Sequence, residues 1–255
     1  MGTEFRIQSS QLLNEITGIE YAFQEINVSA PHTLVFCKQN HSSEVCFVEK
    51  NANSETITKT LADALITNTD LAIGVQTADC LPVLIATKSA SFVAAVHAGW
   101  RGLLGGILVK TVSSLKQNGV LISDIVITIG PSIQHCCFEV GSEVIEEFSK
   151  TWHRIWQNKS PPWTNTQLKN PLAIKHQAPQ TKDSYWFNLQ KIAQMQLTDE
   201  GLTASQIEVL PVCTYCGTND HASYRRATHE KQTAGRQWSW IKKRRRPSEM
   251  RSEGF

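Results

Sequence analysis

The chain has 255 residues, of which 41% are hydrophobic and 19% charged, and its formal net charge is +2. A chain of this size can bury a large apolar core and needs neither a disulfide nor a metal merely to fold. The small net charge gives no overall case for a nucleic-acid partner, although a basic run, KKRRR, occupies 242–246. No apolar run is long enough to span a bilayer, so we expect no membrane association.

The cellular location is predicted from the N-terminus and the cysteines. The first residues lack the charged start, apolar core and small-residue cleavage site of a secretory signal. The seven cysteines are odd in number and irregularly spaced, which fits reduced thiols better than a disulfide framework. We therefore expect a cytoplasmic protein.

The pattern along the chain predicts short buried strands that alternate irregularly with helices. Residues 1–32 are weakly patterned, and after them apolar runs predict strands over 33–37, 43–50, 71–80, 81–87, 91–99, 124–133 and 207–213. Apolar residues at helical spacing predict helices over 103–119 with a stop at Gly119, over 141–150 with Ser142 as N-cap, and over 184–201. The irregular order favours one α/β or α+β domain over a regular doubly wound sheet.

Two segments do not fit this pattern of buried elements. Residues 151–180 hold three tryptophans, several prolines and few aliphatic residues, which predicts a long surface excursion. Residues 242–255 are polar and basic and are interpreted as a terminal tail.

Three potential metal ligands lie at the ends of apolar runs: His41 in QNHSSEV, Cys80 in TADCLPV and His97 in AAVHAGWRG. Imidazole and thiolate both suit zinc, and three protein ligands leave a fourth position for water, as in catalytic zinc sites. Each residue alone has a simpler interpretation, because a core histidine can be hydrogen bonded and a lone cysteine can be a small buried hydrophobe.

Other polar residues near these motifs have a functional and a structural interpretation. Asp79 could orient a ligand histidine, cap a helix or pair with Arg101. Arg101, Arg225 and Arg226 are candidates for binding phosphate, because arginine recognises anions bidentately. The structural alternative for Arg101 is a surface arginine stacked on Trp100, and for Arg225 and Arg226 it is a solvated basic loop.

The remaining cysteines give weaker signals. CTYC (213–216) has a metal-like spacing, with His221 and His229 downstream, but the gap between these histidines is longer than usual for a structural zinc site. Cys136 and Cys137 are adjacent. Since neighbouring cysteines rarely share a site, we expect one to face a pocket and the other the core.

Seven segments occur in the order found in one known protein family. They are QNHSSEV, DALIT, TADCLPV, AAVHAGWRG, GPSIQHCCFEVG, CT, and SYRR followed by TAGR. Each is weak alone, but seven in order are highly specific. Over roughly residues 33–241 the chain therefore resembles the YfiH-like family, whose members are also called laccase-domain or multicopper polyphenol oxidase-like proteins.

The resemblance implies an α+β fold with two mixed β-sheets packed as a sandwich and flanked by helices (αββα) in a single domain. It implies a YfiH-like catalytic domain over 33–241, between the N-terminal segment 1–32 and the tail 242–255. It selects His41, Cys80 and His97 as zinc ligands and catalytic residues. It also implies action on purine nucleosides with phosphate: phosphorolysis of adenosine, inosine, guanosine or methylthioadenosine, and hydrolytic deamination of adenosine.

The chain also departs from the family pattern. It lacks a longer N-terminal region with a GG-x-S stretch and an N-R pair, Ser42 stands where the family tends to have glycine, and His221 and Ala222 stand where bulky aromatics are usual. We therefore expect an altered substrate pocket.

Other functions remain as alternatives. A copper-dependent polyphenol oxidase is disfavoured, because the chain has eight histidines and no H-x-H motif. Two further alternatives are a hydrolase that uses Cys80 as nucleophile on a cell-wall precursor and a non-enzymatic binding protein that contacts an acidic partner through the basic tail. The sequence leaves the oligomeric state open.

Overall fold

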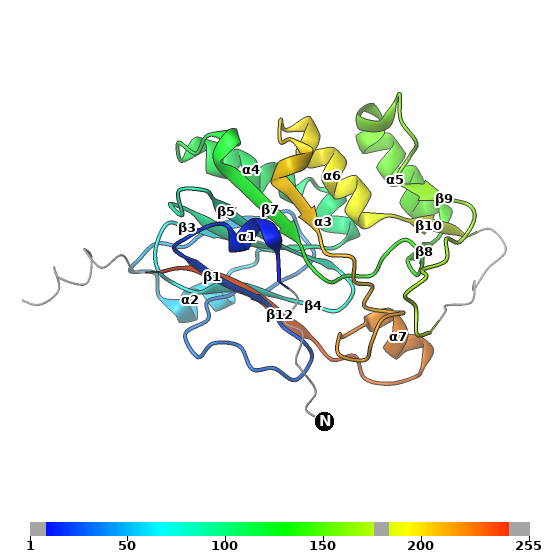
Figure 1. Cartoon of the computed structure of the whole chain (residues 1–255), viewed down its shortest axis with the longest axis horizontal. Coiled ribbons are helices and arrows are strands. Elements are labelled where there is room, and N and C mark those ends of the chain that lie inside the picture. Colours follow the sequence, from blue (N-terminus) through cyan, green and yellow to red (C-terminus); the bar gives the residue numbers. More distant parts are fainter. Residues whose placement is uncertain (1–8, 176–183, 245–255) are drawn as a thin grey trace, which may run out of the picture.

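The computed structural model describes residues 9–175 and 184–244. Two β-sheets lie face to face, and the longer helices cover the outer face of the larger sheet (Figure 1). The expected class, a single-domain α+β sandwich of two sheets flanked by helices, is confirmed. Among the described residues, no helix combines the length and apolar composition that a bilayer span requires.

The larger sheet has six strands in the order β11-β7-β5-β6-β3-β2. Its strands are β2 (Val45–Phe47), β3 (Ala64–Thr67), β5 (Leu81–Thr87), β6 (Val93–Ala98), β7 (Ile125–Ile129) and β11 (Ile207–Val209). The outermost pairs, β2 with β3 and β11 with β7, are parallel, and the inner pairs are antiparallel. Every residue of β5 and β6 is buried, because both faces of the sheet are covered and the two sequences are nearly continuous apolar runs.

The smaller sheet consists of β1 (Ile19–Phe23), β12 (Gln237–Lys243) and β4 (Ile73–Thr77), paired antiparallel in that order. Its inner face packs on the larger sheet through a shared apolar core that includes Val75, Leu84, Ala95 and Ile241. Along β12, buried and half-buried residues alternate, as expected for a strand with one face on the core. The predicted N-terminal segment 1–32 thus contributes β1 and the short helix α1 (Gln11–Asn14).

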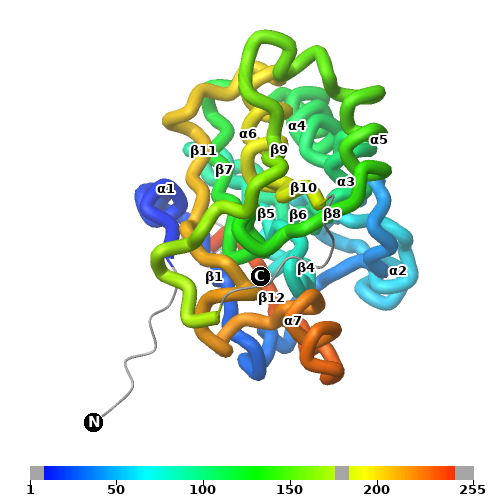
Figure 2. The backbone as a smooth tube through the Cα atoms, turned by 90° about the vertical axis from the view of Figure 1, so that its right-hand side faces the viewer, coloured from blue at the N-terminus to red at the C-terminus, as the bar shows by residue number. Residues whose placement is uncertain are grey.

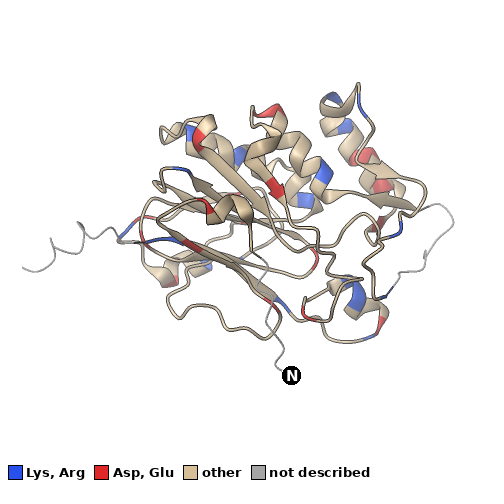
Figure 3. Ribbon diagram, in the orientation of Figure 1, with Lys and Arg blue, Asp and Glu red and all other residues tan. Residues whose placement is uncertain are grey.

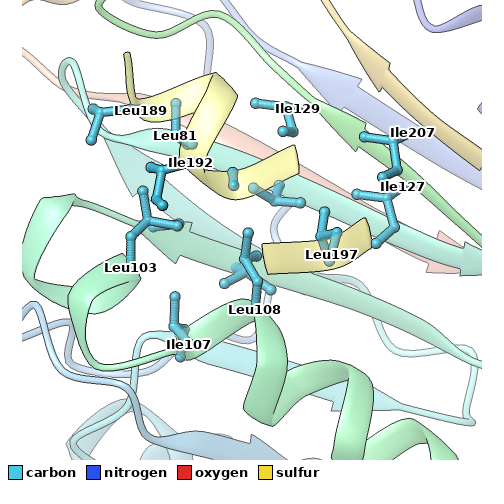
Figure 4. Close-up of a cluster of buried hydrophobic side chains, with 14 of the residues drawn as sticks. Leu81, Leu103, Ile107, Leu108, Ile127, Ile129, Leu189, Ile192, Leu197 and Ile207 are labelled. Atoms are coloured by element: carbon cyan, nitrogen blue, oxygen red, sulfur yellow. The ribbon is translucent and has the colours of Figure 1, made fainter. Parts of the chain in front are cut away.

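A second core lies between the larger sheet and three helices: α3 (Trp100–Leu104), α4 (Ile107–Gln117) and α6 (Leu189–Asp199). In Figure 4, Leu103, Ile107 and Leu108 from α3 and α4, and Ile192 and Leu197 from α6, point toward Leu81, Ile127, Ile129 and Ile207 of the sheet. Gly119 follows α4 with φ +82°, the left-handed conformation that ends helices. The sheet is therefore held between two apolar layers, and its strand ends are fixed in position.

Several predicted elements differ in the structure. The expected helix over 103–119 is divided, because Gly105 and the left-handed Gly106 separate α3 from α4. Residues 33–37 form only an isolated bridge at Val35. The expected helix over 184–201 starts late, because Tyr185–Phe187 is a strand (β10) and Asn188 then caps α6 by accepting a hydrogen bond from the Lys191 amide. Helix α5 (Ser142–Trp152) has Gly141, not Ser142, as its N-cap.

The predicted surface excursion over 151–180 is more ordered than expected where it is described. It contains a 3₁₀ helix (His153–Trp156) and β9 (Trp163–Thr164), and Ile155 and Trp156 are buried. With β8 (Glu139–Val140) and β10, β9 forms a small third sheet. Residues 176–180 of this segment and 245–255 of the predicted tail lie outside the described residues. The predicted domain boundaries stay a prediction.

Replacing Leu84 by Ala is expected to lower the free energy of unfolding by about 2–5 kcal/mol, because it removes a fully buried side chain from the core between the sheets. The control is Leu172→Ala, whose side chain is 74% exposed and whose loss should change stability by less than about 0.5 kcal/mol. Urea unfolding of both variants measures the difference. Equal stability of the two variants would show that the two sheets do not share this core.

Candidate metal centre

The register of β5 and β6 brings Cys80 and His97 together. Leu81 pairs with Ala98 and Pro82 with His97, so Cys80, directly before β5, lies opposite the end of β6. The loop before β2 adds His41. The ligand atoms of His41, Cys80 and His97 all lie within 4.8 Å of one another, and the two imidazole rings meet edge to face at 4.8 Å between centroids. The structure thus assembles the predicted trio.

Gly99 makes room for this close approach. A Cβ atom at Gly99 would lie 2.9 Å from Cys80 Sγ and 3.2 Å from His41 Cδ2, and the first distance is shorter than real Cβ contacts. The glycine after the histidine in HAGWRG is therefore required by the packing of the ligands themselves.

Asp63, directly before β3, positions His41 and His97 of the trio. Its carboxylate is buried, and its Oδ1 lies 2.7 Å from His97 Nδ1. The backbone amides of Asn40, His41 and Ser42 also donate to this carboxylate, at 3.2, 3.0 and 2.7 Å. Since Nδ1 of His97 is occupied by Asp63, its Nε2 is the atom available to a metal, which is the usual carboxylate–histidine arrangement.

The electrostatics of the centre favour a deprotonated sulfur. Burial by itself raises the pKa of Cys80, but the charge of His97 and a hydrogen bond with His41 outweigh burial and lower that pKa to about 7. Burial lowers the pKa of His97, but Cys80 and Asp63 raise it to about 9. Burial likewise opposes ionisation of Asp63, whose hydrogen bonds with His97 and Ser42 hold its pKa at about 2. The thiolate is the form that binds metals.

Within the described residues, no hydrogen bond joins Asp79 to His41 or His97, and its partners lie later in the chain. Asp79 has φ +83°, in the left-handed region, so the chain turns sharply between β4 and Cys80. Its carboxylate accepts hydrogen bonds from Thr214 Oγ1 at 2.6 Å and from the Arg225 amide at 2.7 Å. Burial raises the pKa of this carboxyl despite these bonds. Of the three roles predicted for Asp79, the structure supports helix capping. Asp79 accepts from an amide in the first turn of α7 (Tyr224–His229), next to the N-cap residue Ser223.

A cavity of about 470 Å³ opens from the ligand trio, within the range of roughly 300–1,000 Å³ typical of small-molecule sites. Trp100, Phe138 and Tyr224 contribute aromatic surface to its lining, and Arg101, Arg225 and Arg236 contribute positive charge. Figure 2 looks onto the side of the molecule where α3, β8 and α7, which carry or adjoin these side chains, gather around the strand ends.

The three arginines predicted to bind phosphate are placed differently. Arg101 stacks over Trp100 at 4.3 Å, as its structural alternative proposed, and it also lines the cavity. The basic helix α7 carries the other two (Figure 3). Both Nη atoms of Arg225 donate to the Glu139 carbonyl, each at 3.0 Å. Arg226 is not among the residues that line the cavity, because its guanidinium turns to the carbonyls of Thr214, Tyr215 and His221.

The donor set fits a zinc ion. Two imidazoles and one thiolate are zinc ligands, three protein donors leave a position open, and the trio runs from a buried His97 to an exposed His41 on the cavity side.

The sequence interpretation missed Asp63, Phe138 and Tyr224. An aspartate inside the apolar run ADALIT was the available signal for Asp63, because a buried carboxylate needs partners. The sequence around Phe138 and Tyr224 contains no pattern that predicts a place in the site.

Fold and site together define a class: single-domain α+β proteins with two stacked sheets and a His-Cys-His group at the strand ends. Residues 18–244 match the family described as multi-copper polyphenol oxidoreductase laccase. The chain belongs to this family, which is the YfiH-like family that its sequence motifs indicated.

Relatives with curated names fall in the same family. The chain is 30% identical over 214 residues to adenosine deaminase RL5 from an unknown prokaryotic organism, covering 82% of this chain and 74% of that protein. It is 34% identical over 209 residues to a purine nucleoside phosphorylase of Haemophilus influenzae (82% and 75% covered). It is 32% identical over 212 residues to purine nucleoside phosphorylase YfiH of Escherichia coli K12 (83% and 74%).

A solved structure, YlmD from Geobacillus stearothermophilus, matches with a TM-score of 0.68 at 27% identity and covers 84% of this chain and 74% of that one. The relatives support a purine nucleoside enzyme in the family.

Replacing Asp63 by Asn is expected to weaken zinc binding at the trio by about 10- to 100-fold, because the amide no longer accepts hydrogen bonds from both His97 and the 40–42 backbone. Competition with a chromogenic chelator measures this affinity, and the signal is assigned to the trio by its loss in His97→Ala. The control is Asp124→Asn, which removes a carboxylate bonded to Ser89 near the far end of β5. Wild-type affinity in Asp63→Asn would contradict the role given to this carboxylate.

Proposed function

We propose that this protein is a zinc-dependent purine nucleoside enzyme that catalyses phosphorolysis of purine nucleosides and hydrolytic deamination of adenosine. The observation that carries the proposal is the convergence of His41, Cys80 and His97 at one end of a cavity that also presents aromatic rings and arginines. The names of the relatives support the substrate class. The cytoplasmic location expected from the sequence stays a prediction.

His41, Cys80 and His97 would hold the metal. Zinc held there would supply Lewis acidity and a lowered pKa for water, which is the chemistry that deamination at C6 of adenine requires. Asp63 fixes the tautomer and orientation of His97 through the 2.7 Å contact at Nδ1. Gly99 lets Cys80 and His41 approach without steric hindrance.

The cavity walls provide what a nucleoside needs. Trp100, Phe138 and Tyr224 offer aromatic surface on which a purine base can stack, and the exposed Tyr224 can adjust to it. Phosphate requires cations beside the ribose, and Arg101 and Arg236 bring exposed guanidinium groups to the cavity. Arg225 contributes charge while Glu139 holds its side chain in place. Arg226 acts indirectly here, because it holds the backbone from which α7 starts.

The two reactions are adenosine with water giving inosine and ammonia, and adenosine with phosphate giving adenine and ribose 1-phosphate. Purified protein of known metal content is incubated with adenosine, first without and then with phosphate, and the bases and nucleosides are separated by chromatography. Inosine in the first incubation and free base in the second are expected. Absence of turnover for every purine nucleoside by the zinc-loaded protein would overturn the proposal.

The metal content of the purified protein and the reactivity of Cys80 distinguish this proposal from the two alternative enzymes. A polyphenol oxidase requires copper and oxidation of a phenol such as syringaldazine in air. A cysteine hydrolase requires a free Cys80 thiolate, which iodoacetamide alkylates at the same rate with and without added zinc. Protection of Cys80 by zinc is the result expected from the proposal.

Replacing Arg101 by Ala is expected to raise the KM for phosphate by about tenfold or more, because a charge-assisted hydrogen bond contributes roughly 1.5–3 kcal/mol. The rate of deamination without phosphate should change far less. The matched control is Arg154→Ala, an exposed arginine paired with Asp199 on the helical side. An unchanged KM in Arg101→Ala would remove Arg101 from the phosphate site, and the same measurement applies to Arg225, Arg226 and Arg236.

A further inference from the structure

A second group of metal-ligating side chains lies away from the trio. The sulfur atoms of Cys136, Cys137, Cys213 and Cys216 all lie within 4.8 Å of one another. All four residues are buried, with exposed fractions between 1% and 5%. Four thiols are thus gathered in the interior, in a place where none of them is needed to complete the His-Cys-His centre.

The spacing of the sulfurs fits a tetrahedral ion. With zinc–sulfur bonds of about 2.3 Å, the sulfurs of a tetrathiolate lie about 3.8 Å from one another. Cys136 Sγ and Cys216 Sγ are 3.8 Å apart, far beyond the roughly 2.05 Å of a disulfide bond. An ion at the centre of the group would need only small adjustments of the remaining side chains.

The backbone shapes both halves of this group as tight turns. In CTYCG, the Gly217 amide donates to the Cys213 carbonyl at 3.0 Å, and a Cβ at Gly217 would lie 2.6 Å from that oxygen. Only glycine permits this turn, which points both cysteines of the Cys-x-x-Cys spacing to one side. In the other half, the amides of Cys137 and Phe138 both donate to the Gln134 carbonyl. The two turns are joined by a parallel bridge between Ser132 and Cys213.

The surroundings are those of thiolates rather than of apolar thiols. The Gln134 amide approaches Cys213 Sγ at 3.5 Å, and Asn170 Nδ2 approaches Cys216 Sγ at 3.2 Å. The guanidinium of Arg226 donates to the carbonyls of Thr214 and Tyr215, the two residues between the cysteines. Donors to sulfur and a nearby fixed cation both stabilise negative charge in a buried site.

This arrangement corrects one expectation from the sequence and agrees with the doubt about the histidines downstream of CTYC. Cys136 and Cys137 do not divide between a pocket and the core, because both enter the same group. The histidines downstream of CTYC are not its partners: His221 lies against Gln237, and His229 against the Tyr215 hydroxyl. The partners of CTYC come instead from a turn about eighty residues earlier in the chain.

We propose that Cys136, Cys137, Cys213 and Cys216 bind a second zinc ion in a closed, structural tetrathiolate site. Binding replaces the thiol protons, so Zn²⁺ enters as up to four protons leave and no electron is transferred. The ion ties the turn that leads to Phe138 to the turn whose Thr214 bonds Asp79. It therefore braces one wall of the cavity without touching its contents. The proposal does not depend on the activity assigned to the cavity.

The first test counts metal and thiols in the full-length wild-type protein. We expect two zinc equivalents per chain by mass spectrometry of the metal, one for each group, and seven titratable thiols after denaturation with a chelator. His97→Ala should retain one equivalent. After cobalt substitution, this variant should show the intense sulfur-to-metal charge-transfer absorption of a tetrahedral tetrathiolate.

The second test removes one ligand. Cys216→Ser should lose one equivalent and the tetrathiolate cobalt spectrum, and its thermal unfolding midpoint should fall. The matched control is Cys46→Ser, a half-buried cysteine on β2 outside both groups, which should keep two equivalents. If Cys216→Ser does not fold, the metal count and cobalt spectrum of His97→Ala test the tetrathiolate site instead.

The possible outcomes separate the two metal sites. One equivalent that is lost in His97→Ala overturns the tetrathiolate, as do fewer than seven thiols, which would indicate disulfides. Iron in place of zinc, with a coloured protein as isolated, overturns the choice of metal. One equivalent that is lost in Cys216→Ser and retained in His97→Ala supports the tetrathiolate and counts against the zinc in the proposed function.

Discussion

The arrangement of the His-Cys-His trio depends on one buried carboxylate. Asp63 is fully shielded from solvent, and an ionised carboxylate in that position costs several kcal/mol unless its oxygens are satisfied. Three consecutive backbone amides and the imidazole of His97 satisfy them. This requirement draws the loop that carries His41 over the end of β6 and gives His41 its left-handed backbone, with φ +60°. One acceptor thereby places both histidines of the His-Cys-His trio.

The larger sheet fixes the positions of Cys80 and His97. Strands β5 and β6 lie between two apolar cores, so their register, and with it the position of Cys80 opposite Gly99, cannot shift by one residue without turning the buried faces over. Cys80 and His97 thus belong to the rigid part of the fold. The aromatic residues and arginines of the cavity come mainly from loops and short helices, where changes of sequence alter the pocket without disturbing the ligands.

The sequence predicted the elements that are defined locally. The run LPVLIAT matches β5 residue for residue, and His41, Cys80 and His97 were recognised because ligand chemistry and motif order agree. It could not predict contacts that depend on long-range pairing. The turn at Gly217 is local, but its partnership with Cys136 and Cys137 follows from the pairing of two distant segments. Likewise, the letters YRR do not show that Arg225 faces the cavity while Arg226 turns to backbone carbonyls.

The two cysteine-containing groups occupy environments that suit different tasks. The His-Cys-His trio has three donors, one of them exposed, beside a cavity, so these residues would leave one position of a tetrahedral ion open. The four-cysteine group has four buried donors and no exposed member, so these residues would fill all four positions of a tetrahedral ion. Asp79 links them, since its turn positions Cys80 while its carboxylate bonds Thr214 between two cysteines of the other group. Through this residue, the backbone between Cys213 and Cys216 is connected to the turn that leads into Cys80.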